Sequence, residues 1–535
     1  MKRKNLFLSL ICSIALTIAL VTVTVISIVP KKDKGAGNGS TSTNVSDTGN
    51  VGDNTSPDVT INEDRDGSAE KPYVIYDAET FKAFIVDKYL DENGNYINYL
   101  EKDGDGNFLY PELADGLYYE LDADIDFAGQ EAEVLFNKRI AFNGHIKGNG
   151  HALKNITFNV TKENFVEDYT YTRDGQLIAN IGLFGEVYKA EITDLSITGL
   201  QIVCEDGLYT SIANAEFDIV KSVSVGAIAG IAYESTIEVT VDAKMDAFAY
   251  AVYSENKANG SYAVGGVVGV ASGCAINNTT VKVEMTADEG TAYYVGGVAG
   301  AAFKTTIENA KVDAKVETYA KQALKVAGVV GYAQALQLNT ADVKLAVVAL
   351  DENRLDTDAV TQIDSDKYAS VAGIVARISV PSASKTSKIE NVTVVSTADI
   401  DATFAGAVMD VVLGGNATGT TKYVEIKDVI VDSDVKVLKA FGFAKYLVNT
   451  KVELNLAKVA IVKGVEREFN VRLTGSASLD KDVVQGVVPV EVFMTMERSA
   501  NNEIVNGLEA VKVIVSQSIA LNAYIAEGFG SYVVA

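Results

Sequence analysis

The pattern of apolar and polar positions repeats a two-part unit along the chain. The first part is a hexamer of small residues, such as Val264 to Gly269. The second is a strand-like line whose first residue follows the end of the hexamer by seven positions, here Ile276. The same pair returns at Val295 to Gly300 with Ile307. Repetition of a short β-rich unit predicts a solenoid, in which each unit buries its apolar face against its neighbours.

Five of these repeat units keep the seven-residue step. Their hexamers close at Gly185, Gly230, Gly269, Gly300 and Gly331, and their lines begin at Ile192, Ile237, Ile276, Ile307 and Leu338. Later units are expected at Val371 to Ala376 with Ile389, at Phe404 to Met409 with Ile426, and at Lys439 to Lys445 with Val452. A constant step within units and variable spacing between them is typical of stacked coils with surface insertions. The sequence therefore predicts an all-β fold, a parallel β-helix.

Two features of the unit predict its turns. The glycines of Val264 to Gly269 indicate either close approach of neighbouring backbones or a positive φ at a corner. The third position of most lines is polar, and stacking predicts a ladder of side-chain hydrogen bonds there. The ladder positions are Asn155, Asp194, Asn278, Asn309, Asn391 and Asp428.

The N-terminal region is of a different kind. Residues 1–34 contain an uncharged apolar run from Leu6 to Val29, which is long enough to span a bilayer. We expect an uncleaved signal anchor that makes the membrane a partner of the protein, with a cleaved export signal as the alternative. Residues 35–66 are rich in Gly, Ser, Thr and Asn and are expected to form a flexible linker.

Residues 67–141 are expected to form a small α/β cap at the N-terminal end of the β-helix. Pro72 to Tyr76 is strand-like, and Asp77 is placed to cap a helix with apolar positions at helical spacing up to Tyr89. The β-helix is expected over residues 142–445. Residues 446–535 lose the repeat and are expected to form a β-rich C-terminal cap or small domain.

Composition excludes some classes of function. The formal charge of −25 argues against nucleic acid as a partner, because phosphate binding needs a basic face. Three cysteines without regular spacing predict neither a disulfide framework nor a metal site. The two histidines supply few of the ligands that a zinc site needs and few candidates for the base of a His-based triad.

Three groups of residues are candidates for chemistry. His145 and His151 flank glycine turns, where a structural role is the stronger interpretation. The run Asp103, Asp105 and Asn107 begins like a calcium loop but lacks the later Gly and Glu, which favours a hairpin turn. The alternating residues Asp122, Asp124 and Asp126 suit either a solvated strand face or the paired carboxylates of a glycosidase. We assign no catalytic, cofactor-binding or metal-binding residue and expect no cofactor.

The repeat resembles the GLUG-motif repeat family of bacterial exported proteins. Ile181 to Gly185 and the Val-Gly-Gly-Val-x-Gly hexamers look like the core of its repeat, and Pro72 to Tyr76 with Phe142 to Leu153 look like the leader that precedes it. The similarity covers roughly residues 67 to 445. It implies a right-handed β-helix on a bacterial surface and carries no established catalytic residues.

These observations together predict a non-catalytic, adhesin-like protein at the cell surface, or a secreted one if the N-terminal segment is cleaved. Such a protein presents a binding or structural face, with an extracellular protein or glycan as its ligand. The alternative is a polysaccharide-acting β-helix enzyme, a lyase or a glycosidase.

Overall fold

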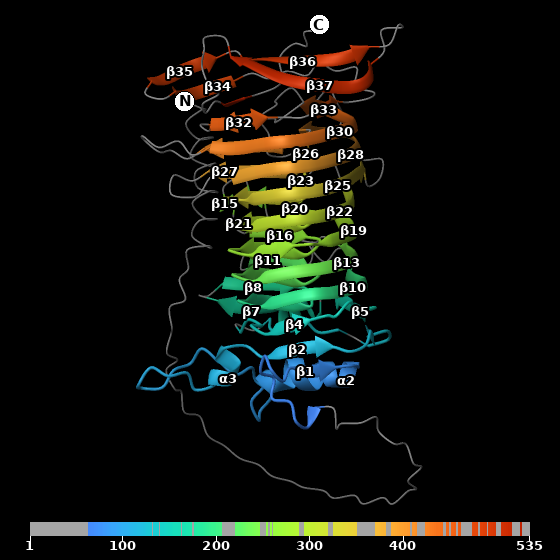
Figure 1. Cartoon of the computed structure of the whole chain (residues 1–535), viewed down its shortest axis with the longest axis vertical. Coiled ribbons are helices and arrows are strands. Elements are labelled where there is room, and N and C mark those ends of the chain that lie inside the picture. The colour runs from blue at the N-terminus through green and yellow to red at the C-terminus, as the bar shows by residue number, and fades with distance from the viewer. Residues whose placement is uncertain are drawn as a thin grey trace, which may run out of the picture. The chain divides into compact units, whose positions relative to one another are not determined.

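The chain divides into two units, Met1–Asp66 and Gly67–Ala535. The computed structural model describes residues 62–130, 132–137, 140–161, 163–173, 176–205, 220–246, 253–254, 257–258, 261–287, 294–318, 325–349, 370–380, 387–406, 409–414, 423–441, 446–448, 451–455, 458–461, 473–479, 482–488, 490–498, 504–515 and 525–526. The second unit is mostly β-strand with a few short helices, and its main sheets are parallel (Figure 1). The predicted all-β class is thus confirmed.

Each repeat unit contributes three successive kinds of strand. The leading strands enter the hexamer; they are β8 (Gln176–Ile181), β11 (Val220–Gly226), β16 (Ser261–Gly265), β20 (Tyr294–Gly296), β23 (Lys325–Ala327) and β26 (Ser370–Ala372). The return strands leave the hexamer; they are β9 (Phe184–Tyr188), β12 (Ala229–Tyr233), β17 (Val268–Ser272), β21 (Ala299–Phe303), β24 (Val330–Gln334), β27 (Val375–Val380), β29 (Met409–Gly414) and β31 (Tyr446–Val448).

The line strands carry the Ile-led lines. They are β10 (Glu191–Cys204), β13 (Thr236–Asp246), β18 (Ala275–Asn277), β19 (Thr280–Ala287), β22 (Thr306–Thr318), β25 (Gln337–Ala349), β28 (Ser387–Gly406), β30 (Tyr423–Phe441), β32 (Lys451–Asn455) and β33 (Lys458–Ile461). The return strands form one eight-stranded sheet in chain order, β9 to β31. The leading and line strands belong to the largest sheet.

Several strands lie outside this scheme. Before the first full unit come β4 (His145–Lys147), β5 (Ala152–Lys154) and β6 (Thr157–Val160), which pair in parallel with β10. Short or antiparallel strands are β7 (Thr170–Arg173), β14 (Tyr253–Ser254), β15 (Lys257–Ala258), β34 (Leu473–Leu479), β35 (Asp482–Val488), β36 (Val490–Arg498), β37 (Ile504–Val515) and β38 (Ile525–Ala526), and helix α4 spans Phe165–Tyr169.

The pairing register repeats the sequence register. Val268 pairs with Ala299, Ile276 with Ile307, and Thr280 with Lys311. These three partnerships have one common offset of 31 residues, the spacing of the two hexamers. Neighbouring units are therefore in register along both the return and the line strands.

The late units are shifted from their expected positions. Ser370 pairs with Phe404 and Val371 with Ala405, so the seventh hexamer begins at Ala405, one residue later than expected. Ile426 pairs with Leu454, so the eighth line begins two residues after the expected Val452. Both errors arise in units that lack the closing glycine of the earlier hexamers, so their positions rested on spacing alone.

Glycine in the hexamer serves close backbone approach. A Cβ on Gly266 would lie 2.2 Å from the carbonyl oxygen of Gly297 and 2.7 Å from Val281 Cγ1. Gly297 has the same relation to Gly328 in the next unit. Gly266 is not among the residues with positive φ, so the alternative explanation of a left-handed corner does not apply to it.

The closing glycine of the hexamer brings the return strand against a leading strand. A Cβ on Gly269 would lie 2.6 Å from the backbone nitrogen of Val225 in β11. A Cβ on Gly300 would lie 2.4 Å from the nitrogen of Val264 in β16. Two sheets can approach this closely only where side chains are absent.

The polar ladder forms in part. Asp194, Asn278, Asn309, Thr340 and Asn391 all have positive φ at the third position of the line, between 47° and 59°. Asn309 Nδ2 donates to Asn278 Oδ1 at 2.9 Å. Thr340 interrupts the ladder, and Asn391 donates instead to Asn339 Oδ1 at 2.9 Å.

Asn155 does not belong to this ladder, contrary to our expectation. The strand that contains Leu153 pairs with Ile197, five residues past the start of the line at Ile192. Asn155 therefore stands at a later bend, and its Nδ2 donates to Asp126 Oδ1 at 2.8 Å. Asp428 lies in β30, and its side chain is outside the described residues.

A second left-handed corner joins each of the five return strands from β9 to β24 to its line strand. Lys189, Glu234, Lys304 and Ala335 have φ between 47° and 54° there, and Gly273 has φ of 69° at the equivalent position. No residue type marks this corner, and the sequence alone did not reveal it.

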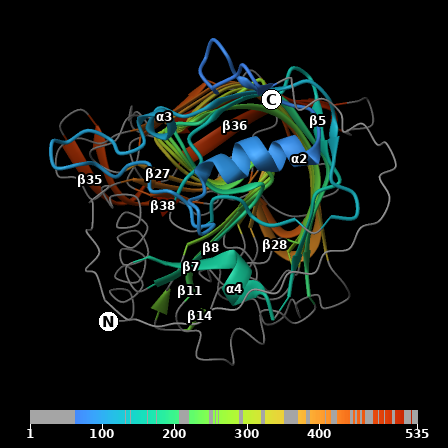
Figure 2. The ribbon, with the colours of Figure 1, turned by 90° about the horizontal axis from the view of Figure 1, so that it is seen from below.

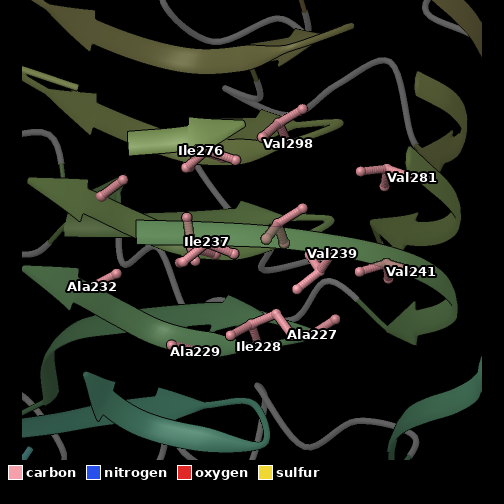
Figure 3. Close-up of a cluster of buried hydrophobic side chains, with 14 of the residues drawn as sticks. Ala227, Ile228, Ala229, Ala232, Ile237, Val239, Val241, Ile276, Val281 and Val298 are labelled. Atoms are coloured by element: carbon pink, nitrogen blue, oxygen red, sulfur yellow. The ribbon is translucent and has the colours of Figure 1, made fainter. Parts of the chain in front are cut away.

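The core lies between the return and line strands. Ile237, Ile276 and Ile307 are fully buried and stack through their pairing. Figure 3 shows Ile276 above Ile237. Full burial of each such side chain contributes about 1.5–3 kcal/mol. Figure 3 also shows Ala227 to Ala229 of one hexamer beneath Ile237, which explains why these hexamer positions are apolar.

The N-terminal cap begins as expected. Strand β1 (Tyr73–Ile75) precedes helix α2 (Ala78–Phe81), and Thr80 N donates to Asp77 Oδ1 at 2.7 Å in a capping box. The helix continues as a π-helical segment, Lys82–Val86, and a 3-10 turn, Asp87–Tyr89. Figure 2 shows α2 lying across the end of the stacked strands. Phe81 and Ile85, from α2 and its continuation, are buried in the core. The cap is completed by α3 (Pro111–Ala114), β2 (Tyr118–Leu121) and β3 (Ile125–Asp126).

The expected membrane partner is corrected. Within the part of the chain that the structure describes, no helix is long and apolar enough to cross a bilayer. Attachment through Leu6 to Val29 is therefore not supported. That segment, like residues 35–61 of the expected linker, lies outside the described residues.

Candidate functional site

The two histidines have separate structural partners. His145 stacks on Tyr118, with ring centroids 4.2 Å apart, and its Nδ1 lies 3.4 Å from Glu191 Oε2. His151 Nδ1 lies 3.5 Å from Asp124 Oδ1. His145 is thus placed by side chains of the adjacent strands β2 and β10, and His151 lies beside Asp124, which directly precedes β3.

The three alternating carboxylates face solvent, and two of them fix strands. Asp124 Oδ1 accepts from Ala152 N at 2.9 Å, and its Oδ2 lies 2.6 Å from Lys154 Nζ. Asp126 Oδ1 accepts from Ala128 N and from Asn155 Nδ2. The hydrogen bond from Lys154 lowers the pKa of Asp124, and that from Asn155 lowers the pKa of Asp126. A general acid in a glycosidase needs a raised pKa, which is the opposite shift.

The calcium-like segment forms a hairpin turn. Asp103 Oδ1 accepts from the backbone nitrogens of Asp105 and Asn107, both at 2.9 Å. Lys102 and Phe108 form an antiparallel bridge across the turn. Hydrogen bonds, the largest from the Asn107 backbone, lower the pKa of Asp103. This carboxylate is therefore engaged by its own turn, as the hairpin interpretation predicts.

One buried polar cluster was missed by the sequence reasoning. Glu186 in β9 is buried, and its Oε1 accepts from the Tyr171 hydroxyl and, at 3.0 Å, from Asn180 Nδ2. The next return strand places Ile231 at the position of Glu186. A carboxylate at a position where the next three units have Ile231, Val270 and Ala301 was the available signal. The cluster ties β7, β8 and β9 together, because each of its three side chains comes from a different strand.

A second polar cluster lies at the later return strands. Arg377 NH1 donates to the Tyr294 hydroxyl at 3.2 Å, and Gln334 Nε2 donates to the Tyr332 hydroxyl at 2.6 Å. Burial raises the pKa of Tyr332. The first of these bonds joins β20 to β27, and the second lies within β24.

Thiol and metal chemistry have no assembled site in the described residues. Cys204 and Cys274 are free, and burial raises the pKa of both thiols. A buried thiol with a raised pKa is a poor nucleophile. Over the described ranges, no group of three or more His, Cys, Asp or Glu side chains is arranged to hold a metal ion.

The chain was compared with known proteins. Neither a protein-family model nor a curated protein matches it. One solved structure with some likeness is titled a putative immunoglobulin A1 protease from Bacteroides ovatus; it is 15% identical and the match covers 72% of this chain and 87% of that one. The TM-score is 0.34, a likeness too low to carry an argument about function.

Proposed function

We propose that residues 142–445 form a right-handed parallel β-helix, and that the protein acts outside the cell as a non-catalytic scaffold presenting a binding or structural face. The register supports the β-helix. Return strands β9 to β31 pair in chain order, each in parallel with the next. A stack of this kind grows by adding units and suits presentation of an extended surface.

The observation that carries the scaffold function is the engagement of the candidate catalytic side chains. Asp124 accepts a hydrogen bond from Ala152 N and pairs with Lys154. Asp126 accepts a hydrogen bond from the side chain of Asn155. Asp103 accepts hydrogen bonds from the backbone of its own turn. Each carboxylate accepts hydrogen bonds that stabilise its charged form. Such groups are well suited to fixing strands and poorly suited to donating a proton.

The outer face of the line strands also suits a structural surface. Asp242, Lys282, Asp313 and Lys344 are partners on four successive units, so the sign of the charge alternates from unit to unit. Lys282 Nζ lies 3.0 Å from Asp242 Oδ2. Opposite charges on directly paired positions favour this register over a slipped one.

Membership of the GLUG-motif repeat family remains our proposal, based on the hexamers and the leader segment. It places the protein among bacterial exported proteins with surface roles. The acidic composition agrees with a soluble, exposed surface.

The test combines two assays on the full chain. A cell-binding assay is expected to show saturable binding, while a screen of polysaccharide substrates is expected to show no turnover. Turnover that is abolished by Asp124→Asn, with the circular dichroism spectrum unchanged, would overturn the scaffold function in favour of a polysaccharide-acting enzyme.

A further inference from the structure

Large apolar side chains are concentrated on one exposed segment of the N-terminal cap. Every residue from Leu100 to Glu112 is exposed, and we call this segment the projecting hairpin. Four exposed large apolar residues lie on it: Leu100, Phe108, Leu109 and Tyr110. Elsewhere in the described ranges, the exposed large apolar residues are Val203 and Val395. Single exposed apolar residues are ordinary, whereas a contiguous group marks an interaction site.

The projecting hairpin is held firmly at both ends. On one side Tyr99 is buried, and its hydroxyl donates to the Ala141 carbonyl at 2.7 Å. On the other side Leu113 is buried, and its carbonyl accepts from Asn143 Nδ2 at 2.7 Å. In Figures 1 and 2 the loop before α3 extends away from the stacked strands. The exposed apolar group therefore lies between two anchored ends, and ordering the hairpin on binding costs little conformational entropy.

The pairing within the hairpin gathers its apolar residues. Lys102 bridges to Phe108, and Leu109 N donates to the Glu101 carbonyl at 2.9 Å. This register brings Leu100 close to Tyr110 across the hairpin. Leu100 of one arm and Tyr110 of the other therefore lie near one another at the base of the turn, with Phe108 two residues from Tyr110.

Charge decides which kind of partner fits. The hairpin carries four acidic residues, Glu101, Asp103, Asp105 and Glu112, and one basic residue, Lys102. An apolar group with an acidic border is complementary to an apolar pocket bordered by Lys and Arg. A second copy of this chain fits poorly, because each copy has a formal charge of −25. A sugar ring stacked on Phe108 would compete with Lys102, whose Nζ lies 4.4 Å from the ring centroid.

We propose that the projecting hairpin is a docking element for a protein partner whose apolar pocket is bordered by basic residues. This inference rests on the proposed scaffold function and names a surface through which the scaffold binds. The apolar side chains supply affinity, and the acidic border supplies orientation and the rate of encounter.

The experiment measures binding of a fluorescein-labelled peptide of alternating Leu and Lys to the full chain by fluorescence anisotropy. The combined variant Leu100→Ser, Phe108→Ser and Leu109→Ser is expected to weaken binding at least about 10-fold. The matched control, Val203→Ser with Val395→Ser, removes exposed apolar side chains elsewhere and is expected to change affinity less than about 2-fold. The charge variant Glu101→Gln with Glu112→Gln is expected to weaken binding at low salt and to converge on the wild type at high salt.

Several results would overturn the docking proposal. One is equal loss of affinity in the hairpin and control variants, and another is equal binding of a peptide of alternating Leu and Glu. Self-association in sedimentation velocity, or binding to a glycan array, that is lost in the hairpin variant would assign the surface to a second copy or to a glycan. If the combined variant misfolds by circular dichroism, Leu109→Ser alone replaces it. Turnover assays judge the scaffold function separately, so failure of one proposal is distinguishable from failure of the other.

Discussion

Asn309 donates its side-chain amide to Asn278 Oδ1 at 2.9 Å, and the two residues occupy the same left-handed turn of successive units. Their φ values are 55° and 47°. Asn tolerates this region better than most residues, and its side chain is also able to form the link between units. Asn therefore satisfies both the positive φ of the turn and the side-chain hydrogen bond between units.

Substitution at Asn309 separates these two contributions. Asn309→Ala loses the hydrogen bond and strains the turn, so we expect it to destabilise the protein by about 1–2 kcal/mol. Asn309→Gly loses only the hydrogen bond and is expected to cost less than Ala. Denaturant unfolding of both variants provides the measurement. Equal losses would mean that positive φ does not select Asn at this position.

The hexamer glycine is predicted to be intolerant of any side chain. Gly266→Ala places a Cβ within 2.2 Å of the Gly297 carbonyl oxygen, so we expect a loss of about 3 kcal/mol or more. Gly104→Ala is the matched control, because a Cβ there meets nothing within 4 Å. Thermal melting of both variants tests the contrast. A Gly266 variant as stable as the Gly104 variant would show that close backbone approach is unimportant.

A glycine at the corner between return and line strands is predicted to increase the stability of the protein. Lys304 has φ of 50°, and Gly is unstrained there, so Lys304→Gly should stabilise the protein by about 0.5–1 kcal/mol. Lys311→Gly, in the exposed part of strand β22, should instead destabilise it by about 0.5–1 kcal/mol. Urea midpoints measure both effects. The idea fails if the two substitutions shift the midpoint in the same direction.

These corners show where sequence reasoning reached its limit. The lines at Ile276 and Ile307 were predictable, because an apolar residue recurs at a fixed step and must face the core. Lys304 and Ala335 were not, because their left-handed conformation is imposed by pairing of the strands on either side. Local preference favours another conformation at both positions, and tertiary structure overrides it.

The candidate site was predictable to a similar degree. The alternation of Leu121 and Ile125 with Asp122, Asp124 and Asp126 correctly separated buried from exposed positions. The partners of these carboxylates were not predictable, because Ala152 and Lys154 come from a strand about 28 residues later. Glu186 was missed because its burial depends on Tyr171 and Asn180, which only the fold brings together.

Asp124 predicts a specific pH dependence of stability. Its pKa in the folded protein is lowered from 3.8, first by the hydrogen bond from Lys154. A lowered pKa means that its contribution is fully present above the unfolded-state value and is lost as the pH falls through the folded-state value. Asp124→Asn should therefore lower the urea midpoint at pH 6 and have little effect near pH 2.

The control for this measurement is Asp122→Asn, on the same exposed edge. A destabilisation by Asp124→Asn that is the same at both pH values would contradict an electrostatic origin. Asp122→Asn is expected to change the midpoint less than Asp124→Asn at pH 6.

The equivalence of the repeat units is the central claim, and deletion tests it. Removing Val270 to Gly300 joins Gly269 to Ala301, and Ile307 then follows Gly269 at the seven-residue step that Ile276 had. Because β12 pairs with β17 in the same register as β17 with β21, β12 gains an equivalent partner. Removing Val270 to Met285 instead leaves the glycine bend, polar turn and apolar face out of register.

The decisive measurement is circular dichroism and thermal melting of these two deletions in the full chain. A stack of equivalent units should survive the 31-residue deletion with its β-sheet signal and cooperative melting retained, shortened by about 4.8 Å. The out-of-register deletion should lose much of both. If the 31-residue deletion collapses as severely as the out-of-register one, the units are not interchangeable, and the proposed β-helix is wrong.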